Sequence, residues 1–257
     1  MTTRGCPFNC NFCASTFLFG KKIRRRSPAD VVDEMEHLVR HYGIREIHIE
    51  DDNPTLVRKH IDALCEELRR RNWKTPWKFP NGIMVMTADA DLLRMMKDAG
   101  CYQISLGIET ANEETDLGKS VPVQKVFEIT REARRIGLET VGLFVVGLPN
   151  ETPAMMRKTI GQSLKMGLDF AHFGIYVPLP GSRWGREATE TKRRFLGINF
   201  FSASQRTSKE AREVKWLQRR AVLSFYLRPR TLLKIAQVLK AKQLPGFLYT
   251  FRRYVFS

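Results

Sequence analysis

Two hydrophobic periods alternate along the first two thirds of the chain. Short stretches with an apolar residue at every second position are followed by longer stretches with apolar residues three or four positions apart. The first period predicts β-strands and the second predicts amphipathic α-helices. The expected strands are 46–50, 77–84, 102–109, 140–146 and 170–177, after a short first strand at 2–5. The expected helices, with their capping residues, are 27–43, 55–71, 87–100, 123–137 and 152–167.

Strands that alternate with helices of this length predict βαβ units and a parallel sheet. A complete (β/α)8 barrel needs about 250 residues, whereas this pattern ends near residue 181. We therefore expect an α/β fold in which residues 1–183 form a partial (β/α)6 TIM-like barrel. The helical periodicity and the basic residues of the segment 184–257 predict a basic, mainly helical C-terminal extension. Its apolar stripes are expected to pack inward at Val214, Leu217, Ala221 and Phe225, and then at Leu232, Leu233, Ile235, Ala236 and Leu239.

The strand 102–109 has one apolar face and one face of small or polar residues. The two faces carry Ile104, Leu106 and Ile108 against Gln103, Ser105, Gly107 and Glu109. Helices must cover the apolar face, so the polar set is expected in the barrel lumen. Similar reasoning gives three lumen candidates for binding substrate or passing protons, namely His48, His172 and Tyr176. In the strand 140–146, Gly142 and Phe144 are expected to point inward.

Three cysteines lie within eight positions near the start of the chain. Cys6, Cys10 and Cys13 have the spacing C-x3-C-x2-C, and the aromatic Phe12 precedes the last of them. Thiolates so close together can converge on one metal centre, and soft thiolates select zinc or iron–sulfur clusters. Three ligands leave a position open for chemistry. A structural zinc site would need a fourth ligand, and the next candidate, His37, lies far down a predicted helix.

This cysteine motif resembles that of the radical SAM enzymes. The resemblance implies that the three cysteines hold a [4Fe–4S] cluster and that S-adenosylmethionine chelates the fourth iron. Other strand ends are similar to segments of the same family: Asp51-Asp52-Asn53, Gly107-Ile108-Glu109-Thr110, Gly147-Leu148-Pro149 and Tyr176-Val177-Pro178-Leu179-Pro180-Gly181. The cofactor-binding residues that it implies are Phe12, Asp51, Asp52, Ser105, Glu109, Gly147, Pro149, Tyr176 and Pro178. Asp52 and Asn53 could instead cap the following helix.

The resemblance is closest to the barrel and C-terminal part of cobalamin-binding radical SAM proteins. It implies reductive cleavage of S-adenosylmethionine to a 5′-deoxyadenosyl radical, followed by methyl transfer or another carbon-centred radical reaction. No Asp-x-His-x-x-Gly cobalamin signature occurs in the chain, so any cobalamin would bind through a domain that this chain lacks. The implied partners are a small-molecule or lipid-like substrate and a flavodoxin- or ferredoxin-type electron donor.

The net charge of +16 adds a second line of interpretation. Such a charge attracts nucleic acid, anionic lipid or an acidic redox partner. The tail 247–257 interleaves aromatic and basic residues, which favours peripheral contact with an anionic membrane. A tRNA-modifying radical SAM enzyme and a zinc-dependent nucleic-acid-binding protein are alternatives, but no RNA-binding module is recognisable and nucleic acid is not the expected partner.

The remaining cysteines and the hydropathy profile predict a cytoplasmic protein. Cys65 and Cys101 stand among apolar neighbours and are expected in the core. No apolar run approaches the roughly 20 residues of a membrane span, and no signal peptide precedes the cysteine motif. A reducing compartment would keep the motif's thiols available for a cluster.

Overall fold

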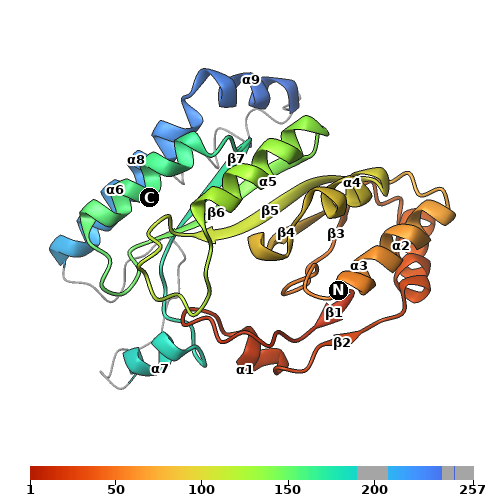
Figure 1. The fold of residues 1–257 in the computed structure, drawn as a ribbon, viewed down its shortest axis with the longest axis horizontal. Coiled ribbons are helices and arrows are strands. Elements are labelled where there is room, and N and C mark those ends of the chain that lie inside the picture. Colours follow the sequence, from red (N-terminus) through yellow and green to blue (C-terminus); the bar gives the residue numbers. More distant parts are fainter. Residues whose placement is uncertain (190–207, 239–245, 247–257) are drawn as a thin grey trace.

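The computed structural model describes residues 1–189, 208–238 and 246. Five parallel strands form one sheet in the order β3-β4-β5-β6-β7, so each strand pairs with its neighbours in sequence. The strands are β3 (Ile47–His48), β4 (Trp77–Ile83), β5 (Cys101–Glu109), β6 (Glu139–Val146) and β7 (Phe170–Ile175). The twisted sheet forms a half-barrel (Figure 1). The predicted α/β partial barrel is confirmed.

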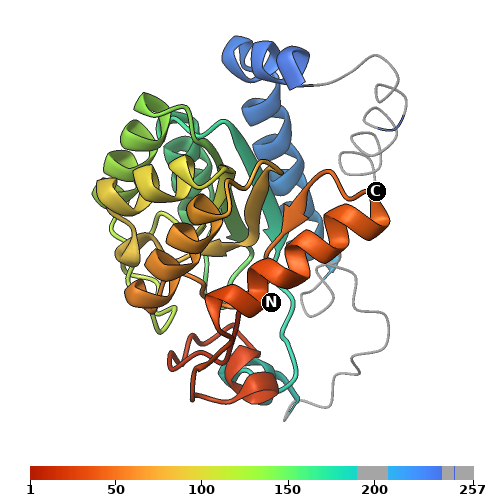
Figure 2. The ribbon, with the colours of Figure 1, turned by 90° about the vertical axis from the view of Figure 1, so that its right-hand side faces the viewer.

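Helices connect the strands and cover the outer face of the sheet (Figures 1 and 2). They are α2 (Pro28–Tyr42), α3 (Arg58–Arg70), α4 (Ala90–Asp98), α5 (Val123–Arg135) and α6 (Pro153–Lys165). Ser27 caps α2 as predicted, because its side chain accepts a hydrogen bond from the Asp30 amide. At α4 the cap is Asp89 rather than Thr87, which lies in the short 3-10 helix η1 (Val85–Thr87).

The first expected strand does not become a sixth parallel strand. It forms β1 (Thr3–Arg4), which pairs antiparallel with β2 (Arg24–Arg25). The amides of Thr2 and Thr3 instead donate to the carboxylate of Asp51, just beyond β3. The Asp51 carboxylate therefore accepts the hydrogen bonds that the carbonyl groups of a neighbouring strand would otherwise have accepted. Among the described residues, the parallel sheet has five strands.

The helix-facing side of the sheet is the core. In β5, Ile104, Leu106 and Ile108 are fully buried, as their parity predicted. In β6 the prediction is wrong, because Gly142 and Phe144 also face the helices. Gly142 pairs in register with Leu106, and the Phe144 ring stacks on that of Phe173 with centroids 5.1 Å apart.

The lumen side of β6 is consequently apolar and half-buried. It carries the alternate residues Val141, Leu143 and Val145. Leu143 approaches Gly82 of β4, where an added Cβ would lie 3.1 Å from its Cδ1 atom. The lumen therefore has a polar wall along β5 and an apolar wall along β6.

In the described part of the chain, the sheet is followed by helices α7 (Arg183–Thr189), α8 (Ser208–Tyr226) and α9 (Pro229–Val238). The stripe predicted for α8 is buried, and the helix packs on β7 and α6, where Gln218 Nε2 donates to the Phe173 carbonyl at 2.9 Å. The stripe predicted for α9 is wrong at Leu232, Leu233 and Ala236, which are exposed because α8 already covers the sheet edge. Leu239 of the same stripe and the aromatic and basic tail at 247–257 lie outside the described residues. Within the described part, no helix is both long and apolar enough to cross a membrane.

Candidate active site

The cysteine loop, residues 5–14, lies at the mouth of the half-barrel, beside the ends of the parallel strands (Figure 1). It connects β1 to α1 (Ser15–Phe19). Cys6, Cys10 and Cys13 are free thiols and all three are half-buried. Gly5 starts the loop with φ +99°, and a Cβ there would lie 2.3 Å from the Lys22 carbonyl oxygen. Only glycine fits this close approach, which brings Cys6 into the loop.

Asn11, between Cys10 and Cys13, ties the loop to the far side of the barrel mouth. Its amide donates to the Leu117 carbonyl at 2.9 Å, and its side chain donates to the Asp116 carbonyl at 2.8 Å. Its own carbonyl accepts from the Trp184 amide of α7 at 3.0 Å. The cysteine loop is therefore held from the loop after β5 and from the helix after β7.

Asp51 ties the other end of the loop to the end of β3. Its carboxylate is completely buried and accepts four hydrogen bonds, from the amides and hydroxyls of Thr2 and Thr3, at 2.5 to 2.9 Å. A carboxylate with this many donors is saturated. The structure thus gives Asp51 a different task from the expected contact with S-adenosylmethionine: it holds the strand that enters the cysteine loop.

Asp52 is the acidic residue that faces the cysteines. Its Oδ1 atom accepts from the Ser15 hydroxyl at 2.8 Å, and the Ser15 oxygen lies 3.3 Å from Cys13 Sγ. Its Oδ2 atom is buried without a hydrogen-bond partner. A buried carboxylate oxygen with no donor is costly, so this atom fits a site for an ammonium group. The helix-capping alternative is wrong, because α3 begins at Arg58 with Val57 as its cap.

Glu109 ends β5 and forms a buried ion pair that the sequence did not indicate. Its Oε1 atom lies 2.5 Å from the Nζ atom of Lys119, and its backbone has φ +62°. Lys119 also donates to the Gly107 carbonyl at 3.1 Å and lies 5.6 Å from the centroid of the Phe12 ring. Lys119 thus brings Glu109 and Phe12 together. The sequence of the loop 110–122 has no feature that distinguishes Lys119 from the other lysines of the chain.

Tyr176 follows β7 and reaches the mouth from the opposite edge of the sheet. Its hydroxyl is buried without a hydrogen-bond partner, and its ring meets that of Trp184 edge-on at 5.6 Å. Burial raises the pKa of this hydroxyl, so it stays a neutral donor. The other expected cofactor residues lie at strand ends or on the lumen side: Ser105, Gly147 and Pro178 are buried and Pro149 is half-buried.

The two histidine candidates do not lie at the mouth. His48 is the last residue of β3, four positions before Asp52, and its Nε2 atom is 2.7 Å from Glu46 Oε1. His172 stands four residues before Tyr176 in the same way. The structure therefore separates both histidines from the cysteine loop.

The three thiols fit an iron–sulfur cluster by their chemistry. Burial raises the pKa of Cys6 and raises that of Cys10 to about 11, while Lys119 acts in the opposite direction on both. Metal coordination would have to displace these protons. Among the described residues, no three Cys, His, Asp or Glu side chains converge as ligands of one ion. A cubane does not require such convergence, because each thiolate binds a different iron.

The cysteine loop on a half-barrel defines an enzyme of the radical SAM type, and comparison with known proteins agrees. Residues 1–162 match the model of the radical SAM superfamily. The chain therefore belongs to this superfamily, whose members use a [4Fe–4S] cluster and S-adenosylmethionine.

The proteins similar to this chain include two curated relatives and one solved structure. An uncharacterized methyltransferase of Pyrococcus horikoshii is 33% identical over 243 residues, which cover 91% of this chain and 52% of that protein. An anaerobic magnesium-protoporphyrin IX monomethyl ester cyclase of Cereibacter sphaeroides is 35% identical over 69% of this chain and 29% of its own length. The radical S-adenosylmethionine methyltransferase TsrM of Kitasatospora setae, solved with cobalamin and a [4Fe–4S] cluster, has a TM-score of 0.65 at 23% identity and covers 74% of this chain and 36% of its own.

The chain spans about half of the first of these relatives and less than a third of the second. The comparisons establish the family and the half-barrel fold of this chain, and they do not identify the reaction or the substrate of the whole protein.

Proposed function

We propose that this chain is the catalytic barrel of a radical SAM enzyme that modifies a substrate held in the lumen. Cys6, Cys10 and Cys13 would hold the [4Fe–4S] cluster, which supplies the electron that cleaves S-adenosylmethionine to methionine and a 5′-deoxyadenosyl radical. One observation carries the proposal: a single loop brings three free thiols to a barrel mouth where the buried oxygens of Asp52 and Tyr176 have no hydrogen-bond partner.

Different residues at the mouth would bind different groups of S-adenosylmethionine. Asp52 Oδ2 would accept from the methionyl ammonium group, since it is the buried anionic atom beside Cys13 that has no donor. Glu109, at the end of β5, would accept from the ribose hydroxyls, and Phe12 would lie against the adenosine. The apolar β6 wall would help to exclude water from the radical.

Methyl transfer is the favoured reaction. A relative that aligns with 91% of this chain is named a methyltransferase, and so is the protein of one similar solved structure. Cobalamin would then bind in a part of the protein outside this chain. Ring formation is the second candidate, because a cyclase is 35% identical over 69% of the chain. The substrate class proposed for either reaction is a small or lipid-like molecule.

Two interactions complete the proposal. A flavodoxin- or ferredoxin-type protein would supply the electron. Peripheral contact with anionic membrane is supported by the net charge of +16 and by the residue pattern of the tail. Membership of the radical SAM superfamily favours the enzyme over a zinc-dependent nucleic-acid-binding protein.

Anaerobic reconstitution with iron and sulfide tests the proposal. The reconstituted chain should turn brown and bind about four irons, and alanine at Cys6, Cys10 or Cys13 should abolish the cluster. Cys65→Ala and Cys101→Ala are the matched controls, because both thiols are fully buried in the hydrophobic core and lie outside the cysteine loop. A loop-cysteine variant that kept full iron and still cleaved S-adenosylmethionine under dithionite would contradict the assignment.

A further inference from the structure

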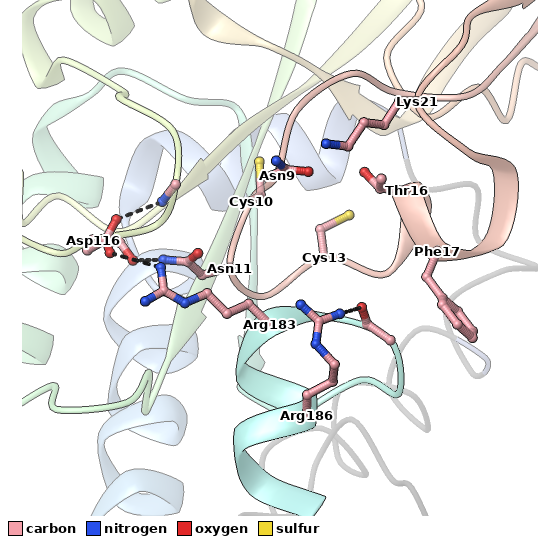
Figure 3. Close-up of a pocket in the computed structure, with 12 residues that line it drawn as sticks. Asn9, Cys10, Asn11, Cys13, Thr16, Phe17, Lys21, Asp116, Arg183 and Arg186 are labelled. Carbon is pink, nitrogen blue, oxygen red and sulfur yellow. Dashed lines mark hydrogen bonds and ion pairs between the residues drawn. The ribbon is translucent and has the colours of Figure 1, made fainter.

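The cysteine loop also lines a cavity whose other residues are not among those assigned to S-adenosylmethionine. This cavity of about 670 Å³ opens between α1, the loop and α7 (Figure 3). The loop contributes Asn9, Cys10, Asn11 and Cys13 to its lining. That lining includes none of Phe12, Asp52, Glu109 and Tyr176.

Positive charge surrounds this cavity. Lys21, Arg183 and Arg186 line the cavity, and Figure 3 shows them on opposite sides of the loop. The one acidic residue of the lining is Asp116, which lies 3.9 Å from Arg183. Lys22 is exposed beside Lys21. A positive potential of this kind attracts a partner with an acidic surface.

An apolar centre lies within the positive rim. Helix α1 buries none of its residues, and Phe17 and Leu18 are 68% and 66% exposed. One side of the Phe17 ring packs on Gly181, where an added Cβ would lie 2.3 Å from Phe17 Cγ, while most of the ring remains exposed. Aromatic residues with arginines around them are typical of protein–protein interfaces.

Two of the three cluster ligands belong to this surface. Cys10 and Cys13 line the same cavity as Phe17, Lys21 and the two arginines, and α1 (Ser15–Phe19) begins two residues after Cys13. Small, electrostatically steered surfaces are characteristic of transient electron-transfer encounters. Helices α1 and α7 also lie together beyond the sheet in both views, away from the helices that cover the sheet (Figures 1 and 2).

We propose that the face formed by Phe17, Leu18, Lys21, Arg183 and Arg186 docks an acidic one-electron carrier protein. The inference rests on the proposed function and adds the place where its electron enters. The carrier is oxidised by one electron and the centre held by the three cysteines is reduced by one. No atom or proton crosses this contact. None of the five residues of this face is among those assigned to S-adenosylmethionine, so the carrier and S-adenosylmethionine would contact different side chains.

The experiment compares two electron sources on the cluster-loaded chain. The double variant Lys21→Glu/Arg186→Glu reverses charge on the patch, and Arg157→Glu/Lys158→Glu makes the same change at exposed positions of α6. Reduction of the cluster is followed by its visible absorbance, first with photoreduced flavodoxin and then with dithionite. S-adenosylmethionine cleavage is measured in the same samples.

With flavodoxin, the patch variant should be reduced at least tenfold more slowly at low salt, and added salt should shrink this difference. With dithionite, both double variants should match the wild type within about twofold. Leu18→Ser, which leaves all charges in place, should also slow the flavodoxin reaction. Flavodoxin rates that are equal in the wild type and all the variants would overturn the docking site.

The two electron sources distinguish an error in the docking site from an error in the proposed function. If the docking site is wrong and the function right, dithionite still drives cleavage and the patch variant retains its flavodoxin rate. If the function is wrong, dithionite drives no cleavage in any form. Loss of binding to anionic vesicles by the patch variant, with an unchanged flavodoxin rate, would also overturn the inference in favour of a lipid surface.

Discussion

The ammonium group of Lys119 lies 2.5 Å from the Glu109 carboxylate, and both side chains are about nine-tenths buried. The pair closes the end of β5 against Phe12 of the cysteine loop. Two charges taken out of water are costly, and each stabilises the other only while both remain. Glu109 therefore combines a structural contact with the role proposed for it in binding the ribose.

The first prediction concerns the stability of this pair. Lys119→Met should lower the free energy of unfolding by roughly 3–5 kcal/mol, because it leaves the Glu109 carboxylate buried without its cation. The double variant Lys119→Met/Glu109→Gln should recover most of that loss. Urea unfolding of the wild type, the two single variants and the double variant gives the coupling energy. Strictly additive losses would show that the two side chains do not interact.

The second prediction concerns S-adenosylmethionine. Glu109→Gln should weaken its binding about tenfold or more, because charge-assisted hydrogen bonds to the ribose contribute roughly 1.5–3 kcal/mol each. The double variant should bind as weakly as Glu109→Gln even though it recovers stability. Titration of the cluster-loaded protein measures both affinities. An affinity equal to that of the wild type would remove Glu109 from the site.

Asp51 and Asp52 should respond in opposite ways to the same substitution. Asp51→Asn places an amide donor against the donors of Thr2 and Thr3, and should cost about 3 kcal/mol of stability and reduce iron incorporation. Asp52→Asn keeps an acceptor for Ser15 and should cost less than about 1 kcal/mol, yet weaken S-adenosylmethionine binding tenfold or more.

Urea unfolding, iron content and titration on both variants separate the two roles. Each variant serves as the control for the other, since the residues are adjacent and the chemical change is identical. Equal losses of stability would contradict the assignment of Asp51 to the N-terminal strand. Wild-type affinity for S-adenosylmethionine in Asp52→Asn would exclude Asp52 from the methionyl subsite.

The sequence was informative where one face of an element is apolar and the other is not. In β5, Ile104 and Leu106 alternate with Gln103 and Ser105, so parity predicted the inner and outer faces correctly. In β6 both faces are apolar, and alternation could not show that Phe144 belongs to the core. The cysteine loop was also predicted, because three thiols at that spacing form a local pattern.

Long-range contacts of single polar residues could not be predicted from the sequence. Asp51 meets Thr2 and Thr3 across 48 to 49 positions, and no period relates them. Lys119 lies in a loop without periodicity, and its partner Glu109 is defined only by the way the loop folds back. Such contacts depend on the tertiary fold, whereas periodicity reports only the local surroundings of each element.

The last prediction concerns acid stability at the opposite end of the lumen from the cysteines. Glu46 accepts hydrogen bonds from Tyr102 and from Lys78, at 3.0 Å for the latter, and lies 2.7 Å from His48. Partial burial acts to raise the pKa of Glu46, but these hydrogen bonds outweigh it and lower the pKa to about 2. The folded state thus binds this proton less readily than the unfolded state does. The contribution to stability is present above pH 4.5 and is lost as the pH falls toward 2.

Glu46→Gln should therefore be less stable than the wild type at pH 6, by about 1 kcal/mol once solvent screening of this partly exposed group is allowed for. The difference should shrink through pH 4 and nearly vanish by pH 2.5. Urea unfolding at the three pH values measures it, with Glu66→Gln at an exposed position of α3 as the control. A difference that stays constant with pH would mean that the loss comes from packing rather than from the charge of Glu46.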